Sequence, residues 1–150
     1  MLDDLEALYT ARLAEFRRVA AAIVGDRDLG RDAVQEAFAS AVAKRRSFRG
    51  DGQLEAWVWR IVVNAARDAR RRQRAHEQEI TEQVAPVETT QRVPLELLTE
   101  RQREVVFLRY YADLDYAAIA AALAISPGTV GAILNAAHHT LRQALQELRL

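Results

Sequence analysis

The segment from Asp115 to Leu141 constrains the fold of this chain most, because its apolar residues keep helical spacing on both sides of a tight turn. Ser126 stands where a helix cap belongs, and Pro127 follows at the first helical position, where a missing N–H costs no hydrogen bond. The apolar positions are Tyr116, Ile119, Ala120 and Leu123 before the turn and Val130, Ile133 and Leu134 after it. This pattern predicts a helix-turn-helix, a unit whose second helix usually enters a DNA groove.

The predicted second helix lacks the charges that DNA binding usually requires. No lysine or arginine occurs from Ser126 to Thr140. Contacts with phosphates supply much of the affinity of proteins for DNA, so this absence conflicts with an ordinary DNA-reading role.

The composition favours a protein built from helices alone. Half of the 150 residues are hydrophobic, which is enough for folded cores, and only six glycines and three prolines occur. The absence of cysteine excludes disulfides, thiolate metal sites and cysteine nucleophiles. The acidic start of the chain, Met1 to Asp4, lacks the basic and then apolar order of a secretory signal, so we expect a cytoplasmic protein.

One uncharged stretch is long enough to cross a membrane. Residues 116–137 contain no Asp, Glu, Lys or Arg. A Ser-Pro-Gly-Thr sequence interrupts the stretch, and alanine rather than leucine fills most of it. We therefore expect a helix pair packed in a soluble domain, with no insertion into a membrane.

The charge distribution suggests two domains. Residues 1–72 carry 14 Lys and Arg against 11 Asp and Glu, whereas residues 73–98 carry two against five. The acidic stretch has little helical periodicity around Pro86, which is typical of a linker. The predicted division is a domain over residues 1–74, a flexible linker over 75–93 and a second domain over 94–150.

Three helices are predicted in the first domain. The first ends near Gly25, Asp28 is expected to cap the second, and the third begins near Leu54 after a glycine-rich break. Trp57 and Trp59 lie two residues apart on the third helix and cannot share one of its faces. We therefore expect one ring in the core and the other at the surface.

Motifs along nearly the whole chain resemble those of one known family. In the first domain they are Asp32-Ala-Val-Gln-Glu-Ala-Phe38, Phe48-Arg-Gly-Asp51, Trp57-Val-Trp-Arg-Ile-Val-Val-Asn64 and Arg70-Arg71-Arg72. In the second domain they are Leu98-Thr-Glu-Arg-Gln-Arg-Glu-Val-Val106, Leu108-Arg109-Tyr110, Tyr116-Ala-Ala-Ile-Ala120 and Ile125-Ser-Pro-Gly-Thr-Val130. Their joint order and spacing resemble the RNA polymerase sigma factors of the sigma-70 family, in the compact extracytoplasmic-function (ECF) subgroup.

The resemblance implies an all-α fold, with a sigma region 2 bundle in the first domain and a region 4 helix-turn-helix in the second. It also implies that the acidic face of the second helix docks on the clamp helices of the largest polymerase subunit, where complementary charge sets orientation and association rate. Without the resemblance, the same charges indicate only a solvated helix face. The residues assigned to polymerase binding are Asp32, Val34, Gln35, Glu36 and Phe38.

The resemblance further implies that the third helix and the loop before it recognise and open the promoter's −10 element. Separated strands need rings for unstacked bases and cations for phosphates, and stacking contributes about 1–3 kcal/mol per base. The loop would receive a flipped base, and the glycines beside Asp51 permit close backbone approach. The residues predicted for this site are Phe48, Arg49, Asp51, Trp59, Arg60, Asn64, Arg67, Arg70, Arg71 and Arg72.

In the second domain the resemblance implies contact with the −35 element, but this chain departs from the family pattern. Relatives resemble Gly-Thr-Val-Lys-Ser-Arg-Leu-x-Arg-Ala-Arg, whereas the four basic positions are Gly131, Ile133, Ala136 and His138 here. Losing one bidentate arginine–guanine pair costs about 1–3 kcal/mol of discrimination. Three outcomes stay open: weak upstream binding, readout by the remaining polar residues, or use of the domain for protein contacts. The residues that would take part are Ser126, Thr129, Val130, Asn135 and His138.

No enzymatic activity, cofactor or metal site is predicted. The adjacent His138 and His139 point about 100° apart on a helix, and the sequence has no phosphate-binding loop, nucleophile elbow or catalytic carboxylate pair.

The expected partners are core RNA polymerase and promoter DNA, together with an anti-sigma factor of the kind that relatives often have. The alternative is a degenerate sigma-like adaptor that binds polymerase or an anti-sigma protein while its C-terminal domain no longer reads DNA. A repressor independent of polymerase is a third possibility, which the neutral second helix disfavours.

Overall fold

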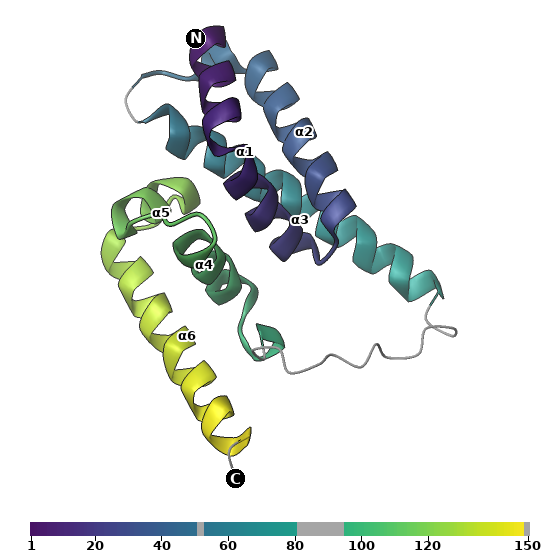
Figure 1. Ribbon diagram of the computed structural model, residues 1–150, viewed down its shortest axis with the longest axis vertical. Coiled ribbons are helices and arrows are strands. Elements are labelled where there is room, and N and C mark those ends of the chain that lie inside the picture. The colour runs from purple at the N-terminus through teal and green to yellow at the C-terminus, as the bar shows by residue number, and fades with distance from the viewer. Residues whose placement is uncertain (51–52, 81–94, 149–150) are drawn as a thin grey trace.

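A computed structural model describes residues 1–50, 53–80 and 95–148, which form helices and the turns between them (Figure 1). The first group of helices is α1 (Leu2–Val24), α2 (Arg27–Ala43) and α3 (Leu54–Ile80), with a short 3-10 helix, η1 (Arg45–Ser47), after α2. The second group is α4 (Glu100–Tyr110), α5 (Tyr116–Leu123) and α6 (Pro127–Leu148), preceded by the 3-10 helix η2 (Leu95–Leu97). This architecture confirms the predicted all-α fold with two helical units.

The first group packs around three aromatic rings. Phe16 of α1 lies between Phe38 of α2 and Trp59 of α3, with ring centroids 5.3 and 4.4 Å away. α1 and α2 approach closely because Gly30 has no side chain: a Cβ there would lie 2.6 Å from the backbone of Ala21. Helix α1 itself is kinked at Arg12, where φ and ψ leave the helical region.

The helix ends of the first group differ from the predictions in two places. α1 ends at Gly25 as expected, with φ 84°, but Asp26 rather than Asp28 caps α2, accepting a hydrogen bond from the Leu29 amide at 2.9 Å. α3 continues to Ile80, six residues beyond Arg74. It therefore includes the start of the segment assigned to the linker, whose remainder lies outside the described residues.

The second group contains the predicted helix-turn-helix. The Asp115 carboxylate caps α5 by accepting from the Ala118 amide at 2.8 Å, and the Ser126 hydroxyl caps α6 by accepting from the Thr129 amide at 3.1 Å. Between the two helices Ala124 adopts a left-handed conformation, with φ 58°. These contacts confirm Ser126 as the cap and Pro127 as the first residue of α6.

Within the described part of the chain, no single helix combines the length and apolarity needed to cross a membrane. Helices α5 and α6 meet that test only as a pair, by length and composition, and are bent by 102° at the break between them.

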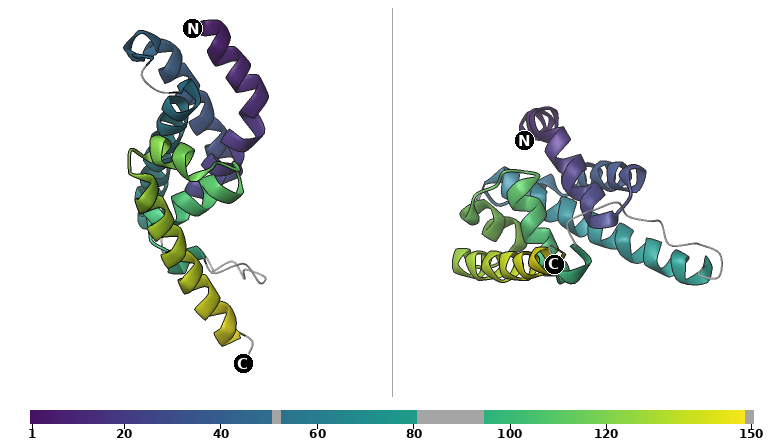
Figure 2. Two further views of the ribbon diagram at one scale, coloured as in Figure 1. Left: turned by 90° about the vertical axis from the view of Figure 1, so that its left-hand side faces the viewer. Right: turned by 60° about the horizontal axis from the view of Figure 1, so that its bottom comes forward.

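The two groups lie against each other. Helix α5 contacts α3, and α4 contacts α1 (Figure 2). The C-terminal half of α6 extends beyond the other helices, as Figure 1 shows. The face of α3 that is predicted to bind DNA therefore adjoins the helix-turn-helix.

Candidate functional site

One face of α3 carries an aromatic ring followed by four polar side chains. Trp57, Arg60, Asn64, Arg67 and Arg71 follow one another at alternating intervals of three and four residues, which places them on one side of the helix. Arg60, Asn64 and Arg71 are exposed, while Trp57 and Arg67 are half-buried. We call these five residues the α3 stripe.

A cavity of about 300 Å³ lies at the N-terminal end of the α3 stripe. The rings of Phe48 and Trp57 form its aromatic part, with centroids 5.3 Å apart, and Arg49 and Arg60 supply cations. This combination suits an unstacked base and its phosphates. Asp51, which was predicted for the same site, lies outside the described residues.

Trp59 does not belong to this surface, and its prediction as a DNA-binding residue is wrong. Its side chain is only 1% exposed and packs against Phe16 in the core of the first group. A ring in that position cannot stack on a base. Trp57 is half-buried and takes the surface position instead.

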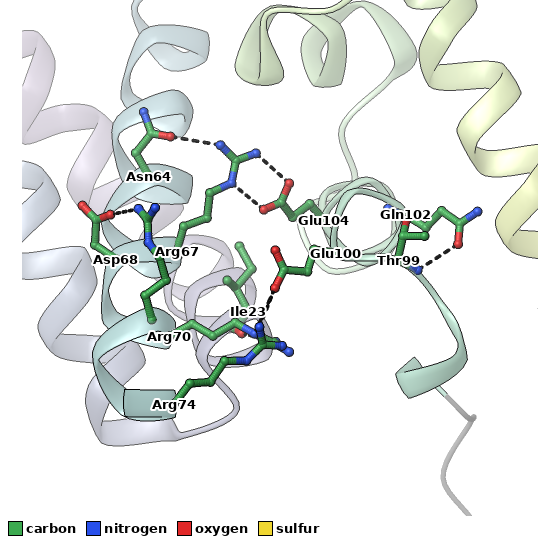
Figure 3. A network of polar contacts seen from close by, with 11 residues as sticks. Ile23, Asn64, Arg67, Asp68, Arg70, Arg74, Thr99, Glu100, Gln102 and Glu104 are labelled. Atoms are coloured by element: carbon green, nitrogen blue, oxygen red, sulfur yellow. Dashed lines mark hydrogen bonds and ion pairs between the residues drawn. The ribbon is translucent and has the colours of Figure 1, made fainter. Parts of the chain in front are cut away.

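Arg67 is held by a glutamate of the second group (Figure 3). Its Nε and Nη2 donate to the two carboxylate oxygens of Glu104, at 2.5 and 2.6 Å, and its Nη1 donates to the Asn64 amide oxygen at 3.2 Å. The hydrogen bond to Glu104 raises the pKa of the Arg67 guanidinium, against the effect of burial. Glu104 is 6% exposed, so removing Arg67 would leave a buried charge without a partner.

Two further arginines of α3 are engaged beside this pair. Arg70 donates to the Ile23 carbonyl at 2.8 Å, which satisfies an unpaired carbonyl in the last turn of α1. Burial lowers the pKa of Arg70, and repulsion from Arg103 and Arg74 lowers it further. Arg74 pairs with Glu100 at 2.9 Å. Arg70 is thus a structural residue of the first group in this arrangement.

The second group also accepts hydrogen bonds from the other end of the α3 stripe. Arg60 donates to the Ala121 carbonyl of α5 at 2.7 Å. At the kink of α1, Arg12 donates to the Ala112 carbonyl at 3.0 Å and pairs with Glu55 at 3.3 Å. The second group therefore contacts both ends of the α3 stripe, through α4 at the Arg67 end and through α5 at the Arg60 end.

Of the residues predicted on α2 to bind polymerase, some are exposed and others are buried. Asp32, Gln35 and Glu36 are exposed and present a polar face with two negative charges. Val34 and Phe38 are 1% and 9% exposed. The prediction that these two side chains contact polymerase is wrong, because both pack inside the first group.

Arg72 lies with the α2 face rather than with the other DNA-binding candidates. Its guanidinium is 3.5 Å from the Glu36 carboxylate. One helical position after Arg71, its side chain points about 100° away from the α3 stripe. Arg71 itself pairs with Asp68, one turn earlier on the exposed surface.

The predicted −35 surface of α6 is small and neutral. Val130 is fully buried in the second group, so its prediction as a DNA contact is wrong. The Ser126 hydroxyl is used in the cap, and the His138 ring shares a 2.8 Å hydrogen bond with the Tyr110 hydroxyl. The exposed positions between the start of α6 and His139 are Pro127, Gly128, Thr129, Ala132, Asn135, Ala136 and His139.

Two residues of the site were not predicted from the sequence. Trp57 could have been identified, because it shares the three- and four-residue spacing of Arg60 and Asn64. Glu104 offered no such signal, since its partner Arg67 lies 37 residues away and meets it only through packing of the two groups.

Comparison with known families assigns each group of helices. Residues 8–76 match the Sigma-70 region 2 model, and residues 95–148 match the model of Sigma-70, region 4. The ECF RNA polymerase sigma factor SigM of Mycobacterium tuberculosis is 34% identical to this chain, in a match that covers 85% of this chain and 68% of SigM.

Two solved structures share the fold. CnrH, solved in complex with the cytosolic domain of CnrY, superposes with a TM-score of 0.75 at 21% identity, over 98% of this chain and 90% of CnrH. The sigma factor RpoE, solved in complex with the anti-sigma factor NepR from Bartonella quintana, superposes with a TM-score of 0.69 at 22% identity, over 96% and 98% of the two chains. Since both region models match and SigM is a relative along most of the chain, this protein belongs to the sigma-70 family of promoter-directing RNA polymerase sigma factors, in its extracytoplasmic-function group.

Proposed function

We propose that this sigma factor binds core polymerase through the exposed face of α2 and opens the −10 element with the α3 stripe and its cavity. The α3 stripe is the observation that carries the proposal. It sets one accessible ring and three arginines on one helix face, next to a cavity with a second ring. Rings for bases and guanidiniums for phosphates are what separated strands require.

The polymerase contact is proposed for Asp32, Gln35 and Glu36. All three are exposed on α2, on a face that is distinct from the α3 stripe. Two carboxylates on one face favour a basic partner surface and orient the encounter. Arg72 neutralises part of this charge through Glu36, so we include it with the polymerase face rather than with DNA binding.

The −35 contact is proposed to be weak. The exposed part of α6 offers Thr129 and Asn135 as hydrogen-bonding groups but no cation before Arg142. Without phosphate contacts, duplex affinity and its salt dependence both fall. Promoter choice would then depend mainly on the −10 element.

Paired binding of a DNA phosphate to Arg67 requires the arrangement of Figure 3 to change. Three of the five N–H groups of its guanidinium already donate, two to Glu104 and one to Asn64. The edge formed by Nε and Nη2 can bind a phosphate through two parallel hydrogen bonds only when the Glu104 carboxylate leaves it. We propose that α4 moves away from α3 when the protein engages a promoter.

Run-off transcription with core polymerase tests the proposal. Templates are selected from genomic fragments, and specific initiation that depends on this protein is the expected result. Failure of the protein to bind core polymerase would overturn the proposal. As a control, Asp32→Asn with Glu36→Gln should reduce core binding, whereas Arg101→Ala, on the exposed side of α4, should not.

The neutral surface of α6 also favours a second candidate function, that of an adaptor that binds polymerase without choosing promoters. The same run-off assay separates the two functions. Core binding without initiation on any template would support the adaptor, and initiation from defined start sites would exclude it.

An inhibitory partner is proposed because RpoE, one of the solved relatives, was captured with an anti-sigma factor. Such a partner would hold the two helical groups together and keep Arg67 paired with Glu104. Affinity purification of the tagged chain from its own cells, followed by run-off assays with the recovered protein, tests this. Recovered proteins that leave transcription unchanged would contradict it.

A further inference from the structure

A second cationic site lies on the opposite side of α1 from the core, away from the α3 stripe. Four arginines line one cavity of about 470 Å³ together with Tyr111, which follows α4. We call this cavity the arginine cleft. Its charged residues are Arg17 and Arg18 on α1 and Arg27 and Arg31 on α2.

None of these four arginines is neutralised within the described part of the chain. Among the described residues, none forms a side-chain hydrogen bond or an ion pair with their guanidinium groups, and no acidic residue lines the cavity. Five of the six arginines of α3, by contrast, pair with Glu104, Glu100, Asp68 or Glu36. The arginine cleft therefore concentrates uncompensated positive charge.

One donor beside the cleft is unsatisfied. The Nε of Arg17 is buried from solvent and has no hydrogen-bond partner, as is also the case for the Nε of Arg12 and of Arg70. A buried donor without an acceptor is unfavourable, and most such groups in proteins are satisfied by protein, water or ligand. An anion that draws the Arg17 side chain toward the cleft would supply an acceptor for this donor.

We propose that the arginine cleft binds an oligophosphate, that is, an anion with two or more linked phosphate groups. Arginine matches phosphate through paired N–H donors. One phosphate monoester carries a charge of only about −1.5 to −2 at neutral pH, so four guanidiniums match several linked phosphates better than one. The cavity volume is also within the range of about 300–1,000 Å³ that small-molecule sites occupy.

An oligophosphate can belong to a nucleotide or be inorganic polyphosphate, and Tyr111 distinguishes these two sources. Its ring lies parallel to that of Phe107, with centroids 5.5 Å apart, and remains 42% exposed. A nucleotide could stack its base there, whereas inorganic polyphosphate would use the arginines alone. Since Tyr111 belongs to the second group and the arginines to the first, a ligand that touches both favours the arrangement with the groups together.

Calorimetric titration of the full chain with tripolyphosphate tests the proposal, at an ionic strength of about 0.15 M where distant charges are screened. We expect saturable binding with one site per chain. Arg27→Ala with Arg31→Ala should weaken binding at least about tenfold, because two charge-assisted contacts are lost. The single change Arg18→Ala should weaken binding less, because it removes only one charge-assisted contact.

The matched control is Arg101→Ala with Arg142→Ala. Both residues are exposed arginines outside the cleft, so this variant loses the same net charge. Its affinity should stay within about twofold of the parent chain, since no ligand contact is removed. Equal weakening in both double variants, or no saturable binding to the parent chain, would overturn the proposal.

Titration with ATP identifies the source. Tighter binding of ATP than of tripolyphosphate, with the difference abolished by Tyr111→Ala, indicates a nucleotide. Equal binding of the two, unchanged by Tyr111→Ala, indicates inorganic polyphosphate. A short DNA duplex that displaces tripolyphosphate at equal phosphate concentration would show that the cleft binds a nucleic acid backbone and would contradict the proposal.

Discussion

Helices α3 and α6 are each the last helix of their group, each is proposed to face DNA, and they differ in charge. Between Arg60 and Arg74, α3 carries six arginines, whereas α6 has no lysine or arginine from its start to Thr140. Both helices are nevertheless well formed, and both bury an apolar face. The presence of a helix-turn-helix therefore says little by itself about affinity for DNA.

The comparison separates what shapes a recognition unit from what makes it bind. The turn before α6 keeps its cap at Ser126, its left-handed residue at Ala124 and its buried Val130. These features depend on backbone geometry and core packing, which do not involve the exposed face. The exposed face determines phosphate binding, and on α6 this face has no lysine or arginine before Arg142.

The largest expected effect separates the two tryptophans of α3. Trp59→Ala removes a fully buried ring and should lower the free energy of unfolding by about 3–5 kcal/mol. Trp57→Ala removes a half-buried ring at the surface and should cost much less stability while reducing promoter opening. Denaturant melts and permanganate probing of open promoters measure the two effects. Similar melting midpoints for both variants would contradict the assignment.

Removing cations from α3 should affect transcription far more than removing polar groups from α6. Arg60→Ala with Arg71→Ala is expected to lower promoter opening about tenfold or more, since two phosphate-binding groups are lost. Thr129→Ala with Asn135→Ala should change it less than about threefold, because few α6 contacts are expected. Core polymerase binding should be unchanged in both. Equal losses of opening would remove the distinction between the two helices.

Adding charge to α6 should strengthen the weak DNA contact that is proposed for this helix. Ala136 is exposed, so Ala136→Arg adds a guanidinium at the surface without disturbing the core. We expect tighter binding of polymerase holoenzyme to promoter duplex, and a steeper salt dependence by about 0.9 in the log–log slope. Ala136→Gln is the control of similar length without charge. If the two variants behave alike, α6 does not lie close to DNA.

Weakening the contact between the groups should free the α3 stripe. Glu104→Gln keeps the shape of the side chain and removes the charge that holds Arg67. We expect the free protein to bind single-stranded −10 DNA about threefold more tightly, because charge-assisted hydrogen bonds are replaced by weaker ones. Fluorescence anisotropy measures this, with Glu96→Gln as the comparison, because Glu96 is exposed and lies outside the contacts between α3 and α4. A decrease in affinity would indicate that Glu104 positions Arg67 for DNA.

The smallest effect is expected at the turn of the helix-turn-helix. Ala124 is left-handed, a conformation that glycine adopts at no steric cost. Ala124→Gly should therefore stabilise the protein by less than about 1 kcal/mol, since the greater freedom of glycine in the unfolded chain offsets part of the gain. Thermal melting measures it. A lower melting temperature would show that Ala124 is not strained.

Much of the fold was accessible from the sequence, because caps and apolar spacing are local signals. Ser126 and Pro127 predicted the start of α6, and the apolar spacing around them predicted the buried face. The two tryptophans show the limit of that reasoning. Spacing predicted that they lie on different faces but did not by itself show which face is buried. The polar residues on the same side of the helix as Trp57 indicate that this side is the exposed one.

The site was predicted less well than the fold, for a physical reason. Motif residues such as Val34, Phe38 and Val130 are core residues in this structure, so belonging to a motif did not mean being exposed. The pairing of Arg67 with Glu104, and of Arg72 with Glu36, arises only when separate helices pack. Local sequence carries no signal for such contacts.

Footprinting of the complete holoenzyme on a promoter that it transcribes tests the central claim most directly. If α3 carries the DNA affinity and α6 does not, bases of the −10 element should become reactive to permanganate while bases around −35 stay unprotected. Strong base-specific protection around −35 by the unmodified protein, lost in Asn135→Ala, would contradict that claim.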